Sequence, residues 1–490
     1  MSGPRPAFRA PRRAGAVLFA TALAVSFLPV SAVSQAWRQD QLLIGGWGIT
    51  RFGDAAMYKR LAGAGIDLAA AADSFHLAPI DSALLAARTV QELRDADPSF
   101  KLRLLSHVLA GRPGPGDLQG NADVARNEAA IGGTLDALAS YSSVAGFWVG
   151  DEPADSAAMA RVADLARLVA RRSPGRLPFV NLFPSYVGDT RQHGPVADRW
   201  RANYGQEKSR AYPGYLDDWL RRWRDEPYPA PLLGIDHYPF EPATFVWNDH
   251  FLSLKVARDR ADAWSRPGQP IPLWVFVQLA GNRGRRMTPT PAQIRLQVYA
   301  ALAYGAQGIM YWTLCPSHAV PGYSPALLDD RGEPSDRYDA VARLNAEVHA
   351  LGPTLMQLEW VDVGYSALGG QIGIENDLFT SMKRGPAVVS GEAHSDPACM
   401  VAQFRGRQDG ADYLLVVNRD LKRKPTFRVR LGARADSVQL VRRTDGSRIR
   451  IGVGLDAIEV RDLPPGTGEL YRVVSSLPDW PAGARSRQGR

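Results

Sequence analysis

The 490-residue chain lacks the features that mark several large classes of protein. It has two cysteines, Cys315 and Cys399, which are too few for a disulfide framework, although an oxidising compartment would permit one bond between them. No pair of histidines has ligand spacing on one element, and no predicted strand is followed by a glycine-rich phosphate-binding loop. We therefore expect no metal and no cofactor.

Concentrated positive charge is also lacking. The formal net charge is +8, and the four arginines before residue 14 account for half of it. The rest is spread along the chain, with no run of Lys or Arg on one predicted helix face. A nucleic-acid partner is therefore not expected.

A single long apolar run, at residues 14–28, lies near the N-terminus. It follows an arginine-rich segment without acidic residues and ends at Pro29, and small residues that suit a signal peptidase come next. The run is shorter than the roughly 20 residues that span a bilayer. We predict a signal peptide at residues 1–36, a secreted or periplasmic protein, and no stable membrane anchor after cleavage. An uncleaved anchor is the alternative.

From residue 41 to 351, short apolar runs alternate with longer amphipathic ones. The predicted strands are 42–47, 66–72, 102–106, 144–149, 178–183, 232–235, 273–277 and 308–312, and the predicted helices are 55–64, 82–94, 122–138, 156–171, 215–223, 252–264, 291–304 and 336–351. Eight strand–helix units predict an α/β fold, a (β/α)8 TIM barrel over residues 37–355.

Beyond Pro353 the helical pattern stops. Short strands separated by Gly, Asp and Pro turns are predicted at 398–404, 412–417, 427–431 and 468–473. Strands without intervening helices pair antiparallel, so we predict a small C-terminal β-sandwich domain over residues 356–474. The basic, polar segment 475–490 is predicted to be a disordered tail.

Functional groups of a barrel lie where its strands end, because the loops that follow build the open face. Polar or aromatic residues end all eight predicted strands, which packing alone does not require. They are Trp47, Asp73, His107, Asp151 with Glu152, Asn181, Asp236 with His237 and Tyr238, Gln278, and Tyr311 with Trp312. The carboxylates are the catalytic candidates, and the other residues are candidate substrate contacts.

The strongest of these signals is the segment 147–153, Phe-Trp-Val-Gly-Asp-Glu-Pro. An apolar strand delivers Asp151 and Glu152 to the barrel mouth, and Pro153 delays the next helix. Two adjacent carboxylates in a partly desolvated site raise at least one pKa, which keeps a carboxylic acid protonated as a general acid. The structural alternative is that the pair caps the helix that begins near Ser156.

This segment, together with 234–240 and the stretches 274–278 and 303–312, resembles bacterial secreted barrel proteins related to the clan of family 42 β-galactosidases. The resemblance covers about residues 42–352. It implies that Glu152 is the acid/base residue. The clan has Asn where this chain has Asp151, and its nucleophile ends strand seven, where this chain has Gln278.

Three explanations for the missing nucleophile remain. The strand-seven register is misplaced; or Asp236 supplies the second carboxylate, as nucleophile or as base for a water; or the substrate assists itself. In the third case the Asp151–Glu152 pair resembles that of family 20 hexosaminidases, where Asp orients an N-acetyl group.

We therefore expect a glycoside hydrolase that cleaves O-glycosidic bonds of an extracellular or cell-envelope glycan, with an oligo- or polysaccharide substrate. A non-catalytic carbohydrate-binding barrel is the competing hypothesis. It explains Gln278 but not the Asp151–Glu152 pair.

Overall fold

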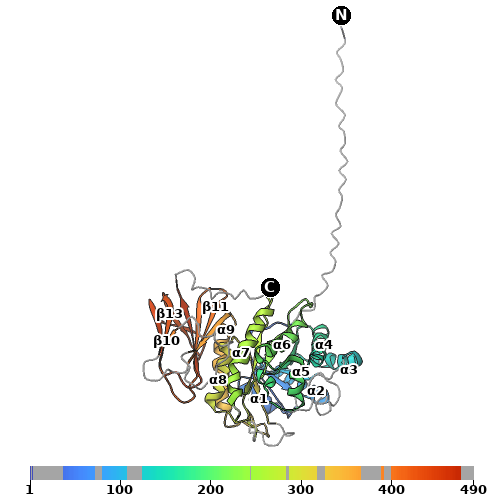
Figure 1. Cartoon of the computed structure of the whole chain (residues 1–490). Coiled ribbons are helices and arrows are strands. Elements are labelled where there is room, and N and C mark those ends of the chain that lie inside the picture. The colour runs from blue at the N-terminus through green and yellow to red at the C-terminus, as the bar shows by residue number, and fades with distance from the viewer. Residues whose placement is uncertain are drawn as a thin grey trace.

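The computed structural model describes residues 1, 3, 37–71, 80–107, 124–242, 244–282, 286–316, 326–365, 388–390 and 399–475. Figure 1 shows a barrel surrounded by helices with a separate group of strands at its side. Most of the predicted signal peptide, nearly all of the predicted tail, and the candidate Asp73 lie outside the described residues. The described residues contain no helix that is both long and apolar enough to span a membrane.

The predicted barrel is confirmed. Eight parallel strands close on themselves in sequence order, and β1 pairs with β8. They are β1 (Leu43–Trp47), β2 (Leu68–Ala71), β3 (Arg103–His107), β4 (Val144–Asp151), β5 (Leu177–Leu182), β6 (Leu233–Ile235), β7 (Leu273–Gln278) and β8 (Gly308–Trp312).

Helices cover the outside of the barrel. They are α1 (Ala55–Gly63), α2 (Ile80–Ala96), α3 (Val124–Ala139), α4 (Ser156–Arg172), α5 (Pro195–Tyr204), α6 (Lys208–Arg221), α7 (Thr244–Trp264), α8 (Pro291–Ala303) and α9 (Tyr338–Leu355). The prediction of one helix between β5 and β6, at 215–223, was incomplete. That connection contains the short 3-10 helix η1 (Ser185–Gly188), α5 and a longer α6.

Large side chains fill the interior of the barrel. Strand side chains alternate between the two faces, so every second residue points inward. Trp148, Phe179, Trp274 and Phe276 form an aromatic cluster there, with ring centroids 4.7 Å apart for Trp148 and Phe179. This cluster fills the barrel along its axis.

The C-terminal strands form two antiparallel sheets, as predicted. One has the order β15-β14-β17-β12-β11-β9 and the other β10-β13-β16. Their bounds are β9 (Leu358–Tyr365), β10 (Val388–Ser390), β11 (Cys399–Gly406), β12 (Asp412–Asn418), β13 (Phe427–Ala435), β14 (Ser437–Val441), β15 (Arg448–Gly452), β16 (Leu455–Val460) and β17 (Gly468–Val474). Apolar residues of both sheets, such as Val401 and Ile458, share one core.

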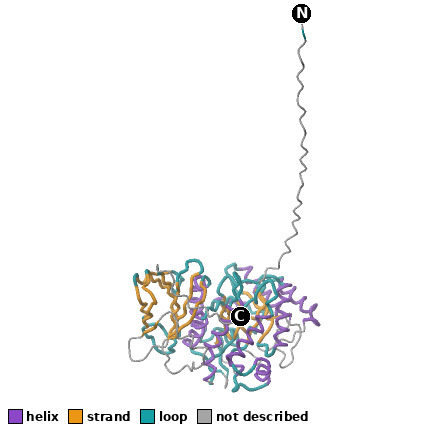
Figure 2. The backbone as a smooth tube through the Cα atoms, turned by 45° about the horizontal axis from the view of Figure 1, so that its top comes forward, coloured by secondary structure: helices purple, strands orange, loops and turns teal. Residues whose placement is uncertain are grey.

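The sandwich lies on one side of the barrel, where its strands β11 and β12 contact α8 (Figure 1 and Figure 2). Glu347 of α9 bonds Arg295 of α8 at 2.6 Å and Arg443, in the turn after β14, at 3.1 Å. The indole N–H of Trp360 donates to the Ala303 carbonyl at 2.9 Å. These contacts fix the two units to one another.

The two cysteines lie in separate cores. Cys315 packs in the barrel with its sulfur 3.9 Å from that of Met57, and Cys399 begins β11 inside the sandwich. The disulfide that the sequence would permit is therefore not formed.

Candidate active site

A β-bulge in β4 sets the direction of the first carboxylate. The register of β4 against β5 shifts between Trp148 and Gly150. Trp148 points inward, whereas a Cβ on Gly150 would lie 2.5 Å from Val162 of α4, so Gly150 faces outward. The extra residue therefore returns Asp151 to the inside of the barrel, opposite Asn181 of β5.

Glu152 follows in the left-handed backbone conformation, with φ of 47°. Its N–H still donates to the Asn181 carbonyl at 2.9 Å, so the backbone is held to the barrel. This conformation is strained for a residue other than glycine, and residues strained in this way cluster at functional sites. Neither carboxylate caps α4, because Asp155 does so by accepting from the Ala158 N–H at 2.7 Å.

The carboxyl groups of Glu152 and Asp236 lie within hydrogen-bonding reach of each other, and each acts on the pKa of the other. Asp236 directly follows β6, and its backbone N–H donates to the Leu182 carbonyl at 3.2 Å. The side chain of Asp236 is buried, while Asp151 and Glu152 keep partial contact with solvent. The barrel mouth therefore contains a carboxyl pair that shares a proton.

The pKa values of the three carboxyls are all raised. Burial raises the pKa of Asp236 to about 6, against hydrogen bonds that favour its ionised form and the charge of Arg286. Burial, then the charges of Asp236 and Asp151, raise the pKa of Glu152 well above its ordinary value. Asp236, with a pKa of about 6, is therefore mostly ionised at neutral pH, and a proton shared by the pair lies on Glu152 rather than on Asp236.

Asp151 is the third member of the cluster. The Asn181 side-chain N–H donates to its Oδ1 at 3.0 Å, which fixes the carboxyl group. Burial raises the pKa of Asp151 to about 7, this hydrogen bond lowers it, and the charge of Asp236 raises it. Asp151 is thus partly protonated at neutral pH.

Aromatic side chains form one wall beside the carboxyls. The rings of Tyr238 and Trp312 are 5.0 Å apart at 39°, and Trp47 pairs in register with Trp312 on the neighbouring strand. Aromatic faces of this kind suit the apolar face of a sugar ring. The structure therefore brings together seven of the sequence candidates: Trp47, Asp151, Glu152, Asn181, Asp236, Tyr238 and Trp312.

Tyr311 and His237 point away from the carboxyls, and His107 lies in the barrel interior with neither ring nitrogen hydrogen-bonded among the described residues. Tyr311 faces outward and donates to Asn345 Oδ1 of α9 at 2.7 Å, so it is not a cleft residue. His237 turns towards α7, where its Nδ1 lies 3.0 Å from Ser253 Oγ. His107 is level with Trp148 in the interior, where their rings stack at 5.9 Å, and burial lowers its pKa to about 4.

Gln278 ends β7 as predicted, but its amide is fully buried and bonded on both sides. It accepts from the Phe240 N–H at 2.9 Å and donates to the carbonyls of Phe240 and Met287 at 3.2 and 2.8 Å. These bonds join the loop after β6 to the loop after β7. The amide is thus a structural tie, and its predicted contact with a sugar hydroxyl has no support here.

Two residues of the site were missed at the sequence level. The Arg286 guanidinium lies over the rings of Tyr238 and Trp312, and its charge acts on both Asp236 and Glu152. Tyr186 of η1 lies close enough to interact electrostatically with Arg286 and Asp236. The arginine-rich loop after β7 was a signal for the first; nothing in the sequence marked the second.

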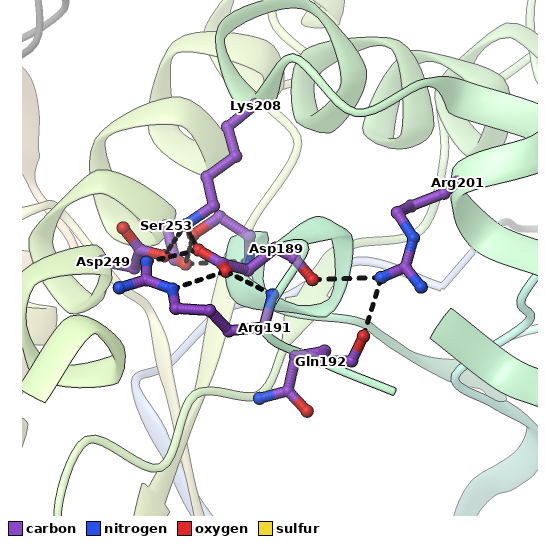
Figure 3. A network of polar contacts seen from close by, with 8 residues as sticks. Asp189, Arg191, Gln192, Arg201, Lys208, Asp249 and Ser253 are labelled. Carbon is purple, nitrogen blue, oxygen red and sulfur yellow. Dashed lines mark hydrogen bonds and ion pairs between the residues drawn. The ribbon is translucent and has the colours of Figure 1, made fainter. Parts of the chain in front are cut away.

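A buried polar network holds the segment that carries Tyr186 (Figure 3). Lys208 at the start of α6 lies between two buried aspartates, 2.7 Å from Asp189 and in contact with Asp249 of α7. Arg191 donates to Asp189 through Nε at 2.7 Å, and Arg201 donates to the Asp189 carbonyl at 3.0 Å. The β5–β6 connection is thereby fastened to α7 behind the site.

No family model matches the chain, and no curated protein is similar to it in sequence. Its fold is similar to that of a β-galactosidase from the psychrophilic Marinomonas ef1, at 12% identity and a TM-score of 0.41, over 64% of this chain and 62% of that one. A GH42 β-galactosidase from G. stearothermophilus, in a catalytic-mutant form, has 9% identity and a TM-score of 0.47, over 89% and 98% of the two chains. A family 30 subfamily 8 xylanase from Clostridium acetobutylicum has 9% identity and a TM-score of 0.42, over 91% and 98%. At these identities the likeness concerns the fold alone and gives no activity to this chain.

Proposed function

We propose that the protein is a glycoside hydrolase whose general acid is Glu152. The observation that carries the proposal is the close pair of carboxyl groups of Glu152 and Asp236 at the mouth of the barrel. Glycoside hydrolysis needs two carboxyl groups that face the same glycosidic bond, one of them protonated and the other ionised. The pKa values of both groups are raised, that of Glu152 well above its ordinary value and that of Asp236 to about 6. Glu152 is therefore the protonated group and Asp236 the ionised one.

In the reaction, Glu152 gives its proton to the leaving glycosidic oxygen as the bond to the anomeric carbon breaks. Asp236, parted from Glu152, is the anion that faces the developing oxocarbenium ion. It then either attacks the anomeric carbon or takes a proton from the attacking water. A pair within hydrogen-bonding reach is closer than the roughly 5 Å of retaining or 6.5 Å or more of inverting enzymes, so substrate must part the two carboxyls.

Asp151 supports a second candidate mechanism. It lies next to the acid and is fixed by Asn181, which is the arrangement needed to orient the acetamido group of a self-assisting substrate. In that case the nucleophile is the substrate's own carbonyl oxygen, and Asp236 only tunes the proton affinity of Glu152.

The test compares Asp236→Ala with Asp151→Ala on a panel of aryl glycosides and cell-wall glycans. We expect Asp236→Ala to abolish turnover and azide to restore part of it, with the configuration of the glycosyl azide reporting the face attacked. Asp218→Ala is the matched control, because Asp218 is equally buried and bonded to Tyr204 and Arg222, but on α6.

Other outcomes select other functions. Greater damage from Asp151→Ala, with turnover restricted to 2-acetamido sugars, would indicate substrate assistance. Full activity of both variants would reject both mechanisms, and binding without turnover by the wild type would indicate a carbohydrate-binding barrel. With the predicted signal peptide, we propose an extracellular or cell-envelope glycan as the natural substrate.

A further inference from the structure

Arg286 is a feature of the site that the proposed chemistry does not use. Its backbone pairs with that of Asn282 in the connection after β7. Its guanidinium carbon lies 4.5 Å from the centre of the Tyr238 ring and 4.7 Å from that of Trp312. The guanidinium therefore covers the rings of Tyr238 and Trp312, so a substrate at this wall would meet Arg286.

A single contact satisfies only part of this group. Nε donates to Glu241 Oε1 at 3.2 Å, and this is the one hydrogen bond of the guanidinium within the described residues. The side chain keeps 24% of its surface accessible. A guanidinium clamped by aromatic rings is already oriented, and its two terminal nitrogens form a planar fork that matches a carboxylate.

With a neutral substrate, the positive charge of Arg286 would destabilise the transition state. The oxocarbenium-like transition state develops positive charge next to Asp236 and Glu152, and Arg286 acts electrostatically on both carboxyls. It also opposes the protonation of Glu152. A negative group on the sugar itself would neutralise Arg286 during the reaction. In keeping with this, residues 279–290 of the sequence contain three arginines and no acidic residue.

We propose that Arg286 is the specificity determinant of this site and that it selects a sugar carrying a carboxylate, a uronic acid residue. The inference rests on the proposed function for its chemistry but not for its binding. Nη1 and Nη2 hold the two carboxylate oxygens while the sugar ring lies along the wall of Tyr238 and Trp312. Glu241 keeps the guanidinium in place through Nε.

The kinetic test uses pairs of aryl glycosides that differ only at C6, a hexuronide and its neutral hexoside. We expect the wild type to prefer the hexuronide in kcat/KM by about 10²-fold, the scale of a charge-assisted bidentate contact. Arg286→Gln should remove most of that ratio, and Arg286→Lys should recover little because the fork is lost. The ratio does not depend on the fraction of folded enzyme.

Arg172→Gln is the matched control, since Arg172 is also paired with a carboxylate, Asp136, at 2.8 Å, but on the outer helices. It should keep the wild-type ratio. A wild type that turns over neutral hexosides as well as hexuronides would overturn the proposal. So would a preference for sulfated sugars over hexuronides.

Binding separates this inference from the proposed function. Calorimetry with Glu152→Gln and a short oligouronide should show binding that weakens about 10²-fold when Arg286→Gln is added. If no glycoside is hydrolysed but this binding pattern holds, the hydrolase proposal fails and the specificity of Arg286 stands. If hydrolysis occurs and Arg286→Gln leaves oligouronide binding unchanged, the reverse is true.

Discussion

Replacement of Glu152 by Gln removes one proton and little else. Gln has the same shape, and its amide N–H can donate to Asp236 as the Glu152 carboxyl can. The resting site should therefore stay folded and closed, and only proton donation to the leaving oxygen is lost. General acid catalysis contributes roughly 10²- to 10⁴-fold, or about 3 kcal/mol and more of barrier.

The loss should depend on the leaving group. On a natural glycoside with an alkoxide leaving group, kcat/KM should fall by about 10² or more. On an aryl glycoside with an acidic phenol, which departs without help, it should fall by less than about tenfold. Glu333→Gln, at an exposed ion pair with Arg60, is the control for a neutralised glutamate and should match the wild type.

The pH profile gives an independent readout. In the wild type the acid limb belongs mainly to Asp236, with a pKa of about 6, and the alkaline limb to Glu152, whose pKa is raised well above its ordinary value. Glu152→Gln should abolish the alkaline limb and keep the acid limb. Near-full activity of Glu152→Gln on a poor leaving group, or an unchanged alkaline limb, would refute the assignment.

Three further predictions concern stability. Burial raises the pKa of Asp151 from 3.8 to about 7, so the folded state binds the proton more tightly and stability falls as pH rises from about 4 to 7. Asp151→Asn should match the wild type in Tm near pH 4 and exceed it increasingly up to pH 7; a constant difference would contradict this. Lys208→Met removes the ammonium group that contacts two buried aspartates, of which Asp189 keeps its ion pair with Arg191, and should lower the free energy of unfolding in urea by about 2 kcal/mol. Arg210→Met, at an exposed pair on the same helix, should change it by less than about 0.5 kcal/mol. Gln278→Glu loses two amide hydrogen bonds and buries a charge among carbonyls, so it should lose about 3 kcal/mol and gain no activity; a stable, more active variant would show that a nucleophile can be restored there.

The barrel could be predicted because each strand–helix unit has a local signal. Apolar runs of strand length alternate with amphipathic runs of helix length, and only a closed parallel sheet accommodates eight of them. The failure lies between β5 and β6, where α5 and the start of α6 are rich in charged residues. A helix that meets the barrel through few apolar side chains gives a weak periodic signal.

Strand alternation would have excluded one wrong candidate, Tyr311, whereas a β-bulge keeps in the site a candidate that alternation would have excluded, Asp151. Two-residue alternation separates Trp312, which faces inward, from Tyr311, which bonds to α9. Regular alternation from Trp148 would have placed Gly150 inside and Asp151 outside. The bulge reverses the two orientations, and no pattern in a single sequence predicts a bulge.

Contacts between loops are even harder to predict from the sequence. The pairing of Glu152 with Asp236 depends on the relative height of β4 and β6, and Arg286 reaches the site from a loop whose path no periodicity fixes. The sequence shows which residues lie at the end of each strand. Whether two of these residues come together as a carboxyl pair depends on the tertiary structure.

The hydrogen bonds of Gln278 explain why this barrel has a carboxylate, Asp236, after β6 and an amide at the end of β7. The end of β7 must accept a hydrogen bond from the Phe240 N–H and also donate to two carbonyls, a combination that an amide can provide and a carboxylate cannot. The amide ties together the loops that carry Tyr238 and Arg286, and thereby sets the aromatic wall and the guanidinium at a fixed distance from Asp236. An anion at position 278 would break that tie. Under the proposed function, such a site takes its second carboxylate from the neighbouring strand, and Asp236 is the carboxylate that follows β6.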